Sequence, residues 1–431
     1  MEQGSLKPVG YQPRIHDAIL ARLLDTFGAV EVAGPMWCGK TWTSLAFGES
    51  VTRVGRESVR RTVEADPQTA LIGARPHVID EWQDVPSVWD AVRDELDATG
   101  SPKGSYVLTG SSTPAKERVH HSGAGRIATL RMRTCSLAET GESSGQVSLA
   151  GLFEGRFQPC LVQQRLAPLA TSICKGGWPA LMEATEEEAE RYLDAYLDAL
   201  FDVNIPRRGL DGAESKRVAC SLARTMGGAV KLDTLAADAF AEEGVGQAVR
   251  NKVAAHIAAL EELYIVENVP GWDAPIRSKS RLRTKPKRYF TDPSLAAALL
   301  AATPERLLED GQLFGVLFEA LCLRDLAVYA AALPRAPKEP LRYYRDSDGL
   351  EVDAVIELRD GRWAGFEIKL GENKLDEAAA SLNRLKRKIS LNPAARNPEP
   401  AFLAVIVGAG ELARFDAKRG VYVIPITALG A

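Results

Sequence analysis

The sequence has few of the features that mark secreted, membrane-bound or disulfide-rich proteins. Its six cysteines include no C-x-x-C pair, so neither a disulfide framework nor a zinc site is expected. The longest apolar run, Leu295 to Ala302, is far too short to cross a bilayer. Residues 1–5 do not resemble a signal peptide. We therefore expect a cytoplasmic protein with no membrane contact.

A strong charge of one sign is also missing. The chain of 431 residues carries 53 Lys and Arg against 57 Asp and Glu, a formal net charge of −4. The whole molecule is therefore not expected to attract nucleic acid, and any such surface must be local. The length is enough for roughly two to four domains.

The most informative stretch that is present runs from Gly34 to Thr41. It reads Gly-Pro-Met-Trp-Cys-Gly-Lys-Thr, a complete G-x-x-x-x-G-K-[ST] phosphate-binding loop. Residues 29–33 read as a buried strand and residues 41–47 as the start of a helix, which is the context that the motif needs. Backbone N–H groups and the positive end of the helix would then converge on a polyphosphate.

We expect ATP, accompanied by Mg²⁺, in this loop. Lys40 would reach the β- and γ-phosphates, and the Thr41 hydroxyl would hold the Mg²⁺ ion. Pro35 has no N–H, so the cradle of amides is expected from residues 37–41. The other nucleotide-binding residues that the motif predicts are Gly34, Met36, Trp37, Cys38 and Gly39.

A second element of such a site follows at residues 77–81. An apolar strand there ends in two acids, and Asp80 would orient Mg²⁺ through water while Glu81 polarises the attacking water. An ordinary strand ending in surface acids is the alternative interpretation.

The strand at residues 106–110 leads to Ser111, which could sense the γ-phosphate or could simply belong to a Gly-Ser turn. Arg126 is a candidate arginine finger, acting in cis or from a neighbouring subunit. Most arginines in such segments are instead solvated. Strands at helix-length intervals predict a parallel α/β sheet with its ligand at the carboxyl ends.

The order of these motifs resembles the bacterial and archaeal AAA-type ATPases that carry a C-terminal domain of unknown function. The motifs that carry the resemblance are the phosphate loop, residues 78–86, residues 108–112, residues 125–127, Gly176 to Pro179, residues 287–292, Phe318-Glu319, residues 351–353 and residues 367–369. Many relatives have an arginine at the position of Met36. The resemblance covers nearly the whole chain and implies an ATP-binding, ATP-hydrolysing protein.

The middle of the chain reads as short helices near residues 215–226, 231–240 and 246–264, followed by strand-like segments. Three helices and a hairpin is the order of a winged helix, although a plain helical lid fits almost as well. A run of basic residues without an acid lies next to it, and its alternation would place several of them on one edge of an extended wing that contacts DNA phosphates. A solvated loop is the alternative. The run consists of Arg277, Lys279, Arg281, Arg283, Lys285, Lys287 and Arg288.

The C-terminal region predicts a helix over residues 311–333, strands at 341–345, 350–358 and 362–370, a helix at 375–389 and two further strands. This is the element order of the restriction-endonuclease fold. Asp353 and Glu367 lie on neighbouring strands. A two-residue turn between the strands would face these acids to opposite sides, whereas a three-residue loop with a left-handed Gly361 would pair them.

In the paired register the segment resembles the PD-(D/E)xK nucleases. The resemblance implies that Asp353 and Glu367 hold Mg²⁺, that Lys369 activates water or stabilises charge, and that Glu319 reaches in from the preceding helix. No Pro-Asp pair is present, because Val352 precedes Asp353. Such folds are also retained for binding alone, and an alternating surface hairpin is a further interpretation.

Together these patterns predict an α/β protein with four parts. They are a P-loop NTPase (AAA-like) domain over residues 1–165, a helical linker over 166–212, a winged-helix-like domain over 213–294 and a restriction-endonuclease-like domain over 295–431. The predicted function is ATP-controlled DNA binding or Mg²⁺-dependent DNA cleavage. The alternative is a non-cleaving, ATP-dependent switch or DNA-binding regulator, and a homo-oligomer is possible in either case.

Overall fold

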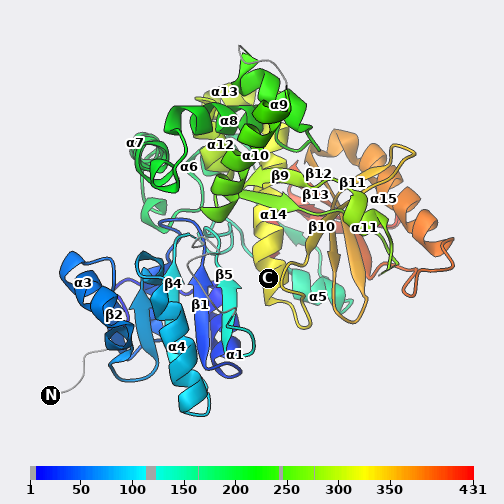
Figure 1. The fold of residues 1–431 in the computed structure, drawn as a ribbon. Coiled ribbons are helices and arrows are strands. Elements are labelled where there is room, and N and C mark those ends of the chain that lie inside the picture. The colour runs from blue at the N-terminus through cyan, green and yellow to red at the C-terminus, as the bar shows by residue number, and fades with distance from the viewer. Residues whose placement is uncertain (1–5, 113–122, 164, 242–245, 276) are drawn as a thin grey trace. The chain divides into compact units, whose positions relative to one another are not determined.

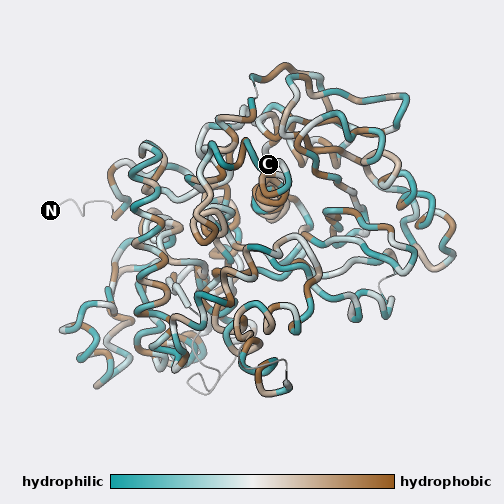
Figure 2. Tube along the Cα trace, turned by 90° about the horizontal axis from the view of Figure 1, so that it is seen from above, coloured by the Kyte–Doolittle hydropathy of each residue, from teal (hydrophilic) through white to brown (hydrophobic). Residues whose placement is uncertain are grey.

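The computed structural model describes residues 6–112, 123–163, 165–241, 246–275 and 277–431. The chain divides into two compact units (Figure 1). The first contains Met1–Thr134 with Glu262–Tyr264, and the second contains Cys135–Glu261 with Ile265–Ala431. Among the described residues, no helix is both long enough and apolar enough to cross a membrane. Figure 2 shows hydrophobic and hydrophilic residues interleaved along the chain.

The first unit is built on a parallel sheet of five strands in the order β2-β3-β4-β1-β5. Side chains alternate between its faces, so Ile79 and Leu108 enter one apolar core while Val78 and Val107 enter another. The sheet is therefore buried on both sides, as parallel sheets usually are. This confirms the predicted parallel α/β domain. Its elements are α1 (Ile15–Leu24), β1 (Ala29–Ala33), α2 (Lys40–Ala46), β2 (Ser50–Arg53), α3 (Glu57–Ala65), β3 (His77–Asp80), α4 (Ser87–Ala98), β4 (Tyr106–Gly110) and β5 (Ile127–Arg131).

After the short elements β6 (Val147–Ser148), α5 (Leu149–Phe153) and β7 (Cys160–Leu161), the second unit contains a largely helical region. Three helices followed by the antiparallel hairpin β8–β9 occur in the order expected from the sequence. The winged-helix assignment itself stays a prediction. The elements are α6 (Leu166–Lys175), α7 (Glu186–Asp198), α8 (Gly212–Arg224), α9 (Leu232–Ala239), α10 (Gln247–Glu262), β8 (Val266–Val269), α11 (Ser280–Arg283), β9 (Lys287–Phe290), α12 (Pro293–Leu299) and α13 (Pro304–Glu309).

The rest of the second unit is a seven-stranded mixed sheet in the order β10-β11-β12-β13-β15-β14-β7. Its first three strands are antiparallel neighbours, whereas β12, β13 and β15 are parallel. The predicted helices and strands are confirmed, and the short strands β14 and β7 were not predicted. The elements are α14 (Gly311–Ala332), β10 (Leu341–Arg345), β11 (Glu351–Glu357), β12 (Trp363–Gly371), α15 (Leu375–Ser390), β13 (Phe402–Ala409), β14 (Leu412–Asp416) and β15 (Val421–Pro425).

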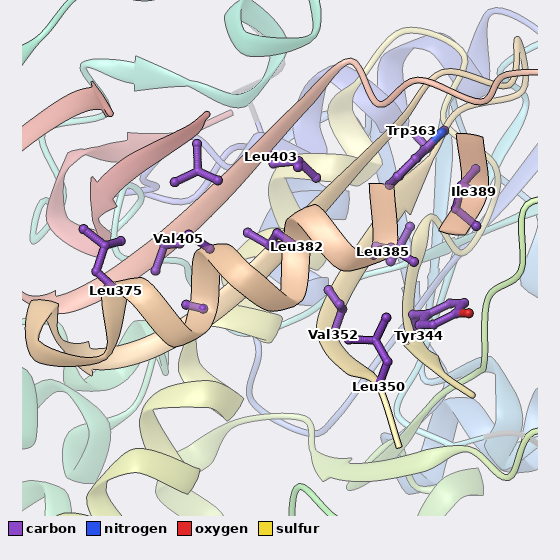
Figure 3. Close-up of a cluster of buried hydrophobic side chains, with 14 of the residues drawn as sticks. Tyr344, Leu350, Val352, Trp363, Leu375, Leu382, Leu385, Ile389, Leu403 and Val405 are labelled. Atoms are coloured by element: carbon purple, nitrogen blue, oxygen red, sulfur yellow. The ribbon is translucent and has the colours of Figure 1, made fainter. Parts of the chain in front are cut away.

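Helix α15 covers one face of this sheet. Its residues Leu375, Leu382 and Ile389 recur every seven positions and share an apolar core with Trp363 and Val405 (Figure 3). The core fixes β11 and β12 against the helix, and these two strands carry Asp353 and Glu367.

Two short strands between residues 147 and 161 pair with strands near the C-terminus. Strand β6 (Val147–Ser148) pairs with β16 (Leu429–Gly430), and β7 (Cys160–Leu161) pairs with β14. Residues 147–161 therefore complete the C-terminal sheets and belong to the second compact unit. Such pairings join residues more than 250 positions apart, so a local pattern cannot show them.

A buried ionic network joins four segments of the second unit. The Arg324 guanidinium contacts Asp292 at 3.0 Å and Asp325 at 2.8 Å, and all three side chains are almost fully buried. Asp292 also accepts the Gly177 N–H, and Asp325 accepts the Leu137 N–H. The Gly176–Pro179 and 287–292 motifs therefore contribute to the packing of this unit.

Replacing Arg324 with Ala is expected to destabilise the second unit by about 3–5 kcal/mol, because two buried carboxylates lose their counter-charge. Urea unfolding of the full chain measures the effect. The control is Arg191→Ala, which removes a solvent-exposed partner of Glu187 and should change little. Equal unfolding midpoints for the two variants would contradict a stabilising role for the network.

Candidate functional site

The phosphate-binding loop connects the carboxyl end of β1 to α2. A Cβ at Gly34 would lie 2.2 Å from the Met132 carbonyl oxygen, so the loop can pass β5 only with glycine there. Trp37 and Gly39 have left-handed φ angles of 62° and 101°. The Lys40 side chain is buried, and its Nζ donates to the Pro35 carbonyl oxygen at 2.7 Å. Lys40 therefore lies inside the loop in which it is predicted to bind phosphate.

Cys38 and Trp37 differ in the exposure of their side chains. The Cys38 side chain is fully buried, so only its backbone could meet a ligand. The Trp37 side chain is 46% exposed. The roles predicted for these residues and for Met36 stay predictions.

The Thr41 hydroxyl and the Asp80 carboxylate lie side by side. Thr41 Oγ1 donates to Asp80 Oδ1 at 2.8 Å, and Thr109 Oγ1 on the intervening strand β4 donates to the same oxygen at 2.7 Å. A hydroxyl and one carboxylate are oxygen donors that suit Mg²⁺, which takes its remaining ligands from phosphates and water. Among the described residues, no group of three or more His, Cys, Asp and Glu side chains could hold a metal by itself. The phosphates would therefore have to complete this site.

Glu81 follows β3 in an uncommon left-handed conformation, with φ 58° and ψ 46°. Its Oε2 atom accepts hydrogen bonds from Ser111 Oγ, at 3.2 Å, and from Gln83 Nε2. Its backbone N–H donates to Thr109 Oγ1 at 3.1 Å. The structure thus brings together the predicted residues Glu81 and Ser111. Gln83 and Thr109 were missed, although both stand within two residues of a predicted site residue.

Arg126 lies at the wrong edge of the sheet for the predicted role in cis. It precedes β5, whose first residue Ile127 is in register with Ala29 at the amino end of β1, whereas the phosphate loop follows the carboxyl end. Its Nε also donates to Asp97 at 2.7 Å. This position does not favour a role in cis within this domain, because Arg126 precedes a parallel strand, β5, that the sequence analysis did not predict. A role towards a neighbouring subunit stays a prediction.

Changing Gly34 to Ala is expected to disrupt the phosphate loop, because the new Cβ would collide with the Met132 backbone carbonyl. We expect both a lower unfolding temperature and at least tenfold weaker nucleotide binding. Gly311→Ala is the control, since a Cβ there meets nothing within 4 Å. Wild-type nucleotide affinity in Gly34→Ala would contradict the close approach.

A second group of polar side chains lies at the β11–β12 hairpin. Leu358 N donates to Arg362 O at 2.9 Å, and Gly361 has a φ of 87°. The register pairs Ala354 with Phe366 and Glu357 with Trp363, so the three-residue loop is the one used. One step further in this register, Asp353 lies opposite Glu367.

Lys369 lies between these two acids. Its Nζ is 3.2 Å from Asp353 Oδ2 and 2.6 Å from Glu367 Oε2. Asp353 Oδ2 also accepts the Ile368 N–H at 2.8 Å. Burial and the nearby Asp353 charge raise the pKa of Glu367 to about 8.

Glu319 of α14 belongs to the same group. It accepts hydrogen bonds from Tyr289 Oη at 2.6 Å and from Lys287 Nζ at 3.4 Å, and Lys287 also lies 2.5 Å from Glu351. Burial, followed by the charge of Asp353, raises the pKa of Glu319 to about 7. Sequence reasoning missed Tyr289, because β9 comes from the helical region. It also missed Glu351, which lies on β11 two residues before Asp353. We call Glu319, Glu351, Asp353, Glu367, Lys287, Lys369 and Tyr289 the carboxylate–lysine cluster.

Asp353 and Glu367 supply two facing carboxylates, so a cation beside them would take its remaining ligands from water or a substrate. Facing carboxylates are the oxygen ligands that Mg²⁺ prefers, and a cation would stabilise acids that burial otherwise protonates. The Lys369 ammonium occupies the position between Asp353 and Glu367, so a cation there would have to displace it. The metal-binding roles of these two acids stay predictions.

The basic run does not form the expected extended edge. Residues 280–283 are helical. Lys287 is buried in the carboxylate–lysine cluster, Arg281 forms a two-pronged contact with Glu357, and Arg288 lies 3.8 Å from Glu261. The alternation argument was therefore wrong, because acids from distant elements neutralise part of the run. The side chains that remain exposed are Arg277, Lys279, Arg283 and Lys285.

Three segments of the chain match known domain families. Residues 27–141 match the AAA domain. Residues 27–141 therefore form an AAA-type domain, and the match supports nucleotide binding by the phosphate loop. Residues 167–306 match a domain of unknown function (DUF8612), and residues 314–429 match another (DUF4143). No curated protein matches the chain.

Several solved structures are similar to this chain at low sequence identity. One is a Walker-type ATPase of Pyrococcus abyssi, with 10% identity, a TM-score of 0.42 and coverage of 68% of this chain and 99% of its own. Two variants of RuvB from Thermotoga maritima have 16% and 17% identity and TM-scores of 0.30 and 0.29. Each covers 62% of this chain and 93% of its own.

Proposed function

We propose that the AAA-type domain binds ATP with Mg²⁺ and hydrolyses it. The observation that carries this proposal is the gathering of Lys40, Thr41, Asp80, Glu81 and Ser111 around the carboxyl ends of β1, β3 and β4. Each side chain has a role that phosphoryl transfer needs, and the match of residues 27–141 to the AAA domain supports the same conclusion.

The side chains divide the work as follows. Lys40 leaves the Pro35 carbonyl and places its ammonium on the terminal phosphates. Thr41 and Asp80 would hold Mg²⁺, which neutralises phosphate charge when it is bound. Glu81 accepts a proton from the attacking water, while Ser111 and Gln83 hold the Glu81 carboxylate in place. Thr109 fixes both Asp80 and the backbone of Glu81, so the two acids keep a constant spacing.

Two variants separate binding from hydrolysis. Lys40→Ala should abolish ATP binding, whereas Glu81→Gln should bind ATP but hydrolyse it roughly 100-fold more slowly or worse, because the general base is lost. Calorimetry and phosphate release measure the two effects. Lys103→Ala, a change at an exposed lysine of the same domain, is the control. Normal hydrolysis by Lys40→Ala would refute the proposed site.

We further propose that the nucleotide state controls a DNA-processing activity of the carboxylate–lysine cluster. Support comes from the convergence of Glu319, Asp353, Glu367 and Lys369, which are the groups that metal-dependent phosphodiester cleavage needs. The exposed basic residues next to α11 could contact the DNA backbone. The alternative is a non-cleaving regulator in which the Lys369 ammonium permanently occupies the cation position.

A plasmid-cleavage assay decides between these alternatives. With Mg²⁺ or Mn²⁺ and ATP, the wild-type chain should nick or cut plasmid, and Asp353→Asn and Lys369→Ala should each lose that activity, because ligand or charge is removed. Glu377→Gln, at an exposed acid of α15, should cleave normally. Absence of cleavage by the wild type in every nucleotide state would favour the regulator.

A further inference from the structure

Arg14 contacts the back of the phosphate loop. This residue stands before α1, and its side chain is only 6% exposed. Its Nη1 donates to the Cys38 carbonyl oxygen at 2.9 Å, and its Nη2 donates to the Arg133 carbonyl oxygen at 3.0 Å. One guanidinium thus ties the loop to the segment that follows β5. A planar fork of donors suits two carbonyls better than a single ammonium does.

The hydrogen bond to Cys38 determines where the next amide points. In a trans peptide the C=O of one residue and the N–H of the following residue point in opposite directions. With the Cys38 carbonyl turned toward Arg14, the Gly39 N–H must point away from Arg14. Within the part of the chain that the structure describes, the Gly39 N–H donates no hydrogen bond to the protein, so it is available to a ligand.

The segment that carries Arg14 is itself held in place. Asp17 accepts hydrogen bonds from the Arg14 backbone N–H at 3.0 Å and from the Tyr11 hydroxyl at 2.6 Å. Tyr11 Oη also lies 3.0 Å from Thr43 Oγ1 on α2. Hydrogen bonds therefore hold the segment that carries Arg14, and the Arg14 guanidinium in turn bonds to the phosphate loop.

We propose that Arg14 is a positioning residue of the nucleotide site, which fixes the Cys38–Gly39 peptide so that the Gly39 N–H faces the phosphates. This inference rests on the proposed nucleotide binding. The amide contacts phosphate in the ground state and in the transition state alike. If the Gly39 N–H loses its orientation, the binding of ADP and ATP should therefore weaken equally. The rate of ATP hydrolysis by the bound complex should stay unchanged.

The test compares Arg14→Ala, Arg14→Lys and the control Arg22→Ala, a change at an exposed arginine of α1, with the wild type. Calorimetry with ADP and ATP in Mg²⁺ gives affinity and stoichiometry, and phosphate release at saturating ATP gives kcat. Arg14→Ala should lose roughly tenfold in affinity for both nucleotides, because a charge-assisted hydrogen bond is misplaced. Its kcat should stay within about twofold, and Arg14→Lys should recover part of the affinity.

Other outcomes overturn the proposal in distinguishable ways. A purely structural role would reduce the stoichiometry and the unfolding temperature while the folded fraction kept wild-type affinity. If Arg14→Ala does not fold, the Arg14→Lys variant provides the test. Wild-type nucleotide affinities in Arg14→Lys would show that a guanidinium bonded to two carbonyls is not required. If the wild type binds neither ADP nor ATP, both the proposed function and the proposed role of Arg14 are refuted. If the wild type and Arg14→Ala bind both nucleotides with equal affinity, only the positioning role of Arg14 is refuted.

Discussion

A single carboxylate oxygen joins several residues of the proposed nucleotide site. Oδ1 of Asp80 accepts hydrogen bonds from Thr41, at the start of α2, and from Thr109, on β4. This oxygen therefore connects β3 and β4 to the helix that begins at the phosphate loop. Thr109 also accepts the Glu81 N–H, and Ser111 donates to the Glu81 carboxylate. Loss of this junction would separate the residue proposed to bind phosphate, Lys40, from the proposed general base, Glu81.

The carboxylate–lysine cluster has a different physical basis. Four acids are gathered with two lysines in a mostly buried space. Burial, followed by the charge of Asp353, raises the pKa values of Glu319 and Glu367. Lys287 reaches the cluster from a hairpin of the helical region, and Lys369 comes from the sheet itself. The segments that match the two domains of unknown function thus share one polar cluster.

The sequence predicted most accurately what is encoded locally. The phosphate loop, the acids after β3 and the helices and strands of the C-terminal sheet depend on residues that are close in the chain. The hairpin register could be narrowed to two alternatives, and the structure selected the one in which Gly361 is left-handed.

What the sequence could not predict depends on distant residues. Arg126 was considered for the nucleotide site because strand β5, which follows it, was not predicted. Lys287 was interpreted as a surface charge because its acidic partners lie on α14 and β11. The contacts of Arg14 could not be predicted from the sequence, because its two acceptors are backbone carbonyls 24 and 119 residues away. Strands β7 and β14 were missed because they are short and partly exposed.

Titration of the intact chain with ATP, with and without Mg²⁺, tests the central claim most directly. The account predicts one nucleotide per chain, tighter binding when Mg²⁺ is present, and loss of that Mg²⁺ dependence when Asp80 is changed to Asn. No detectable heat from either ATP or GTP in the presence of Mg²⁺ would contradict it.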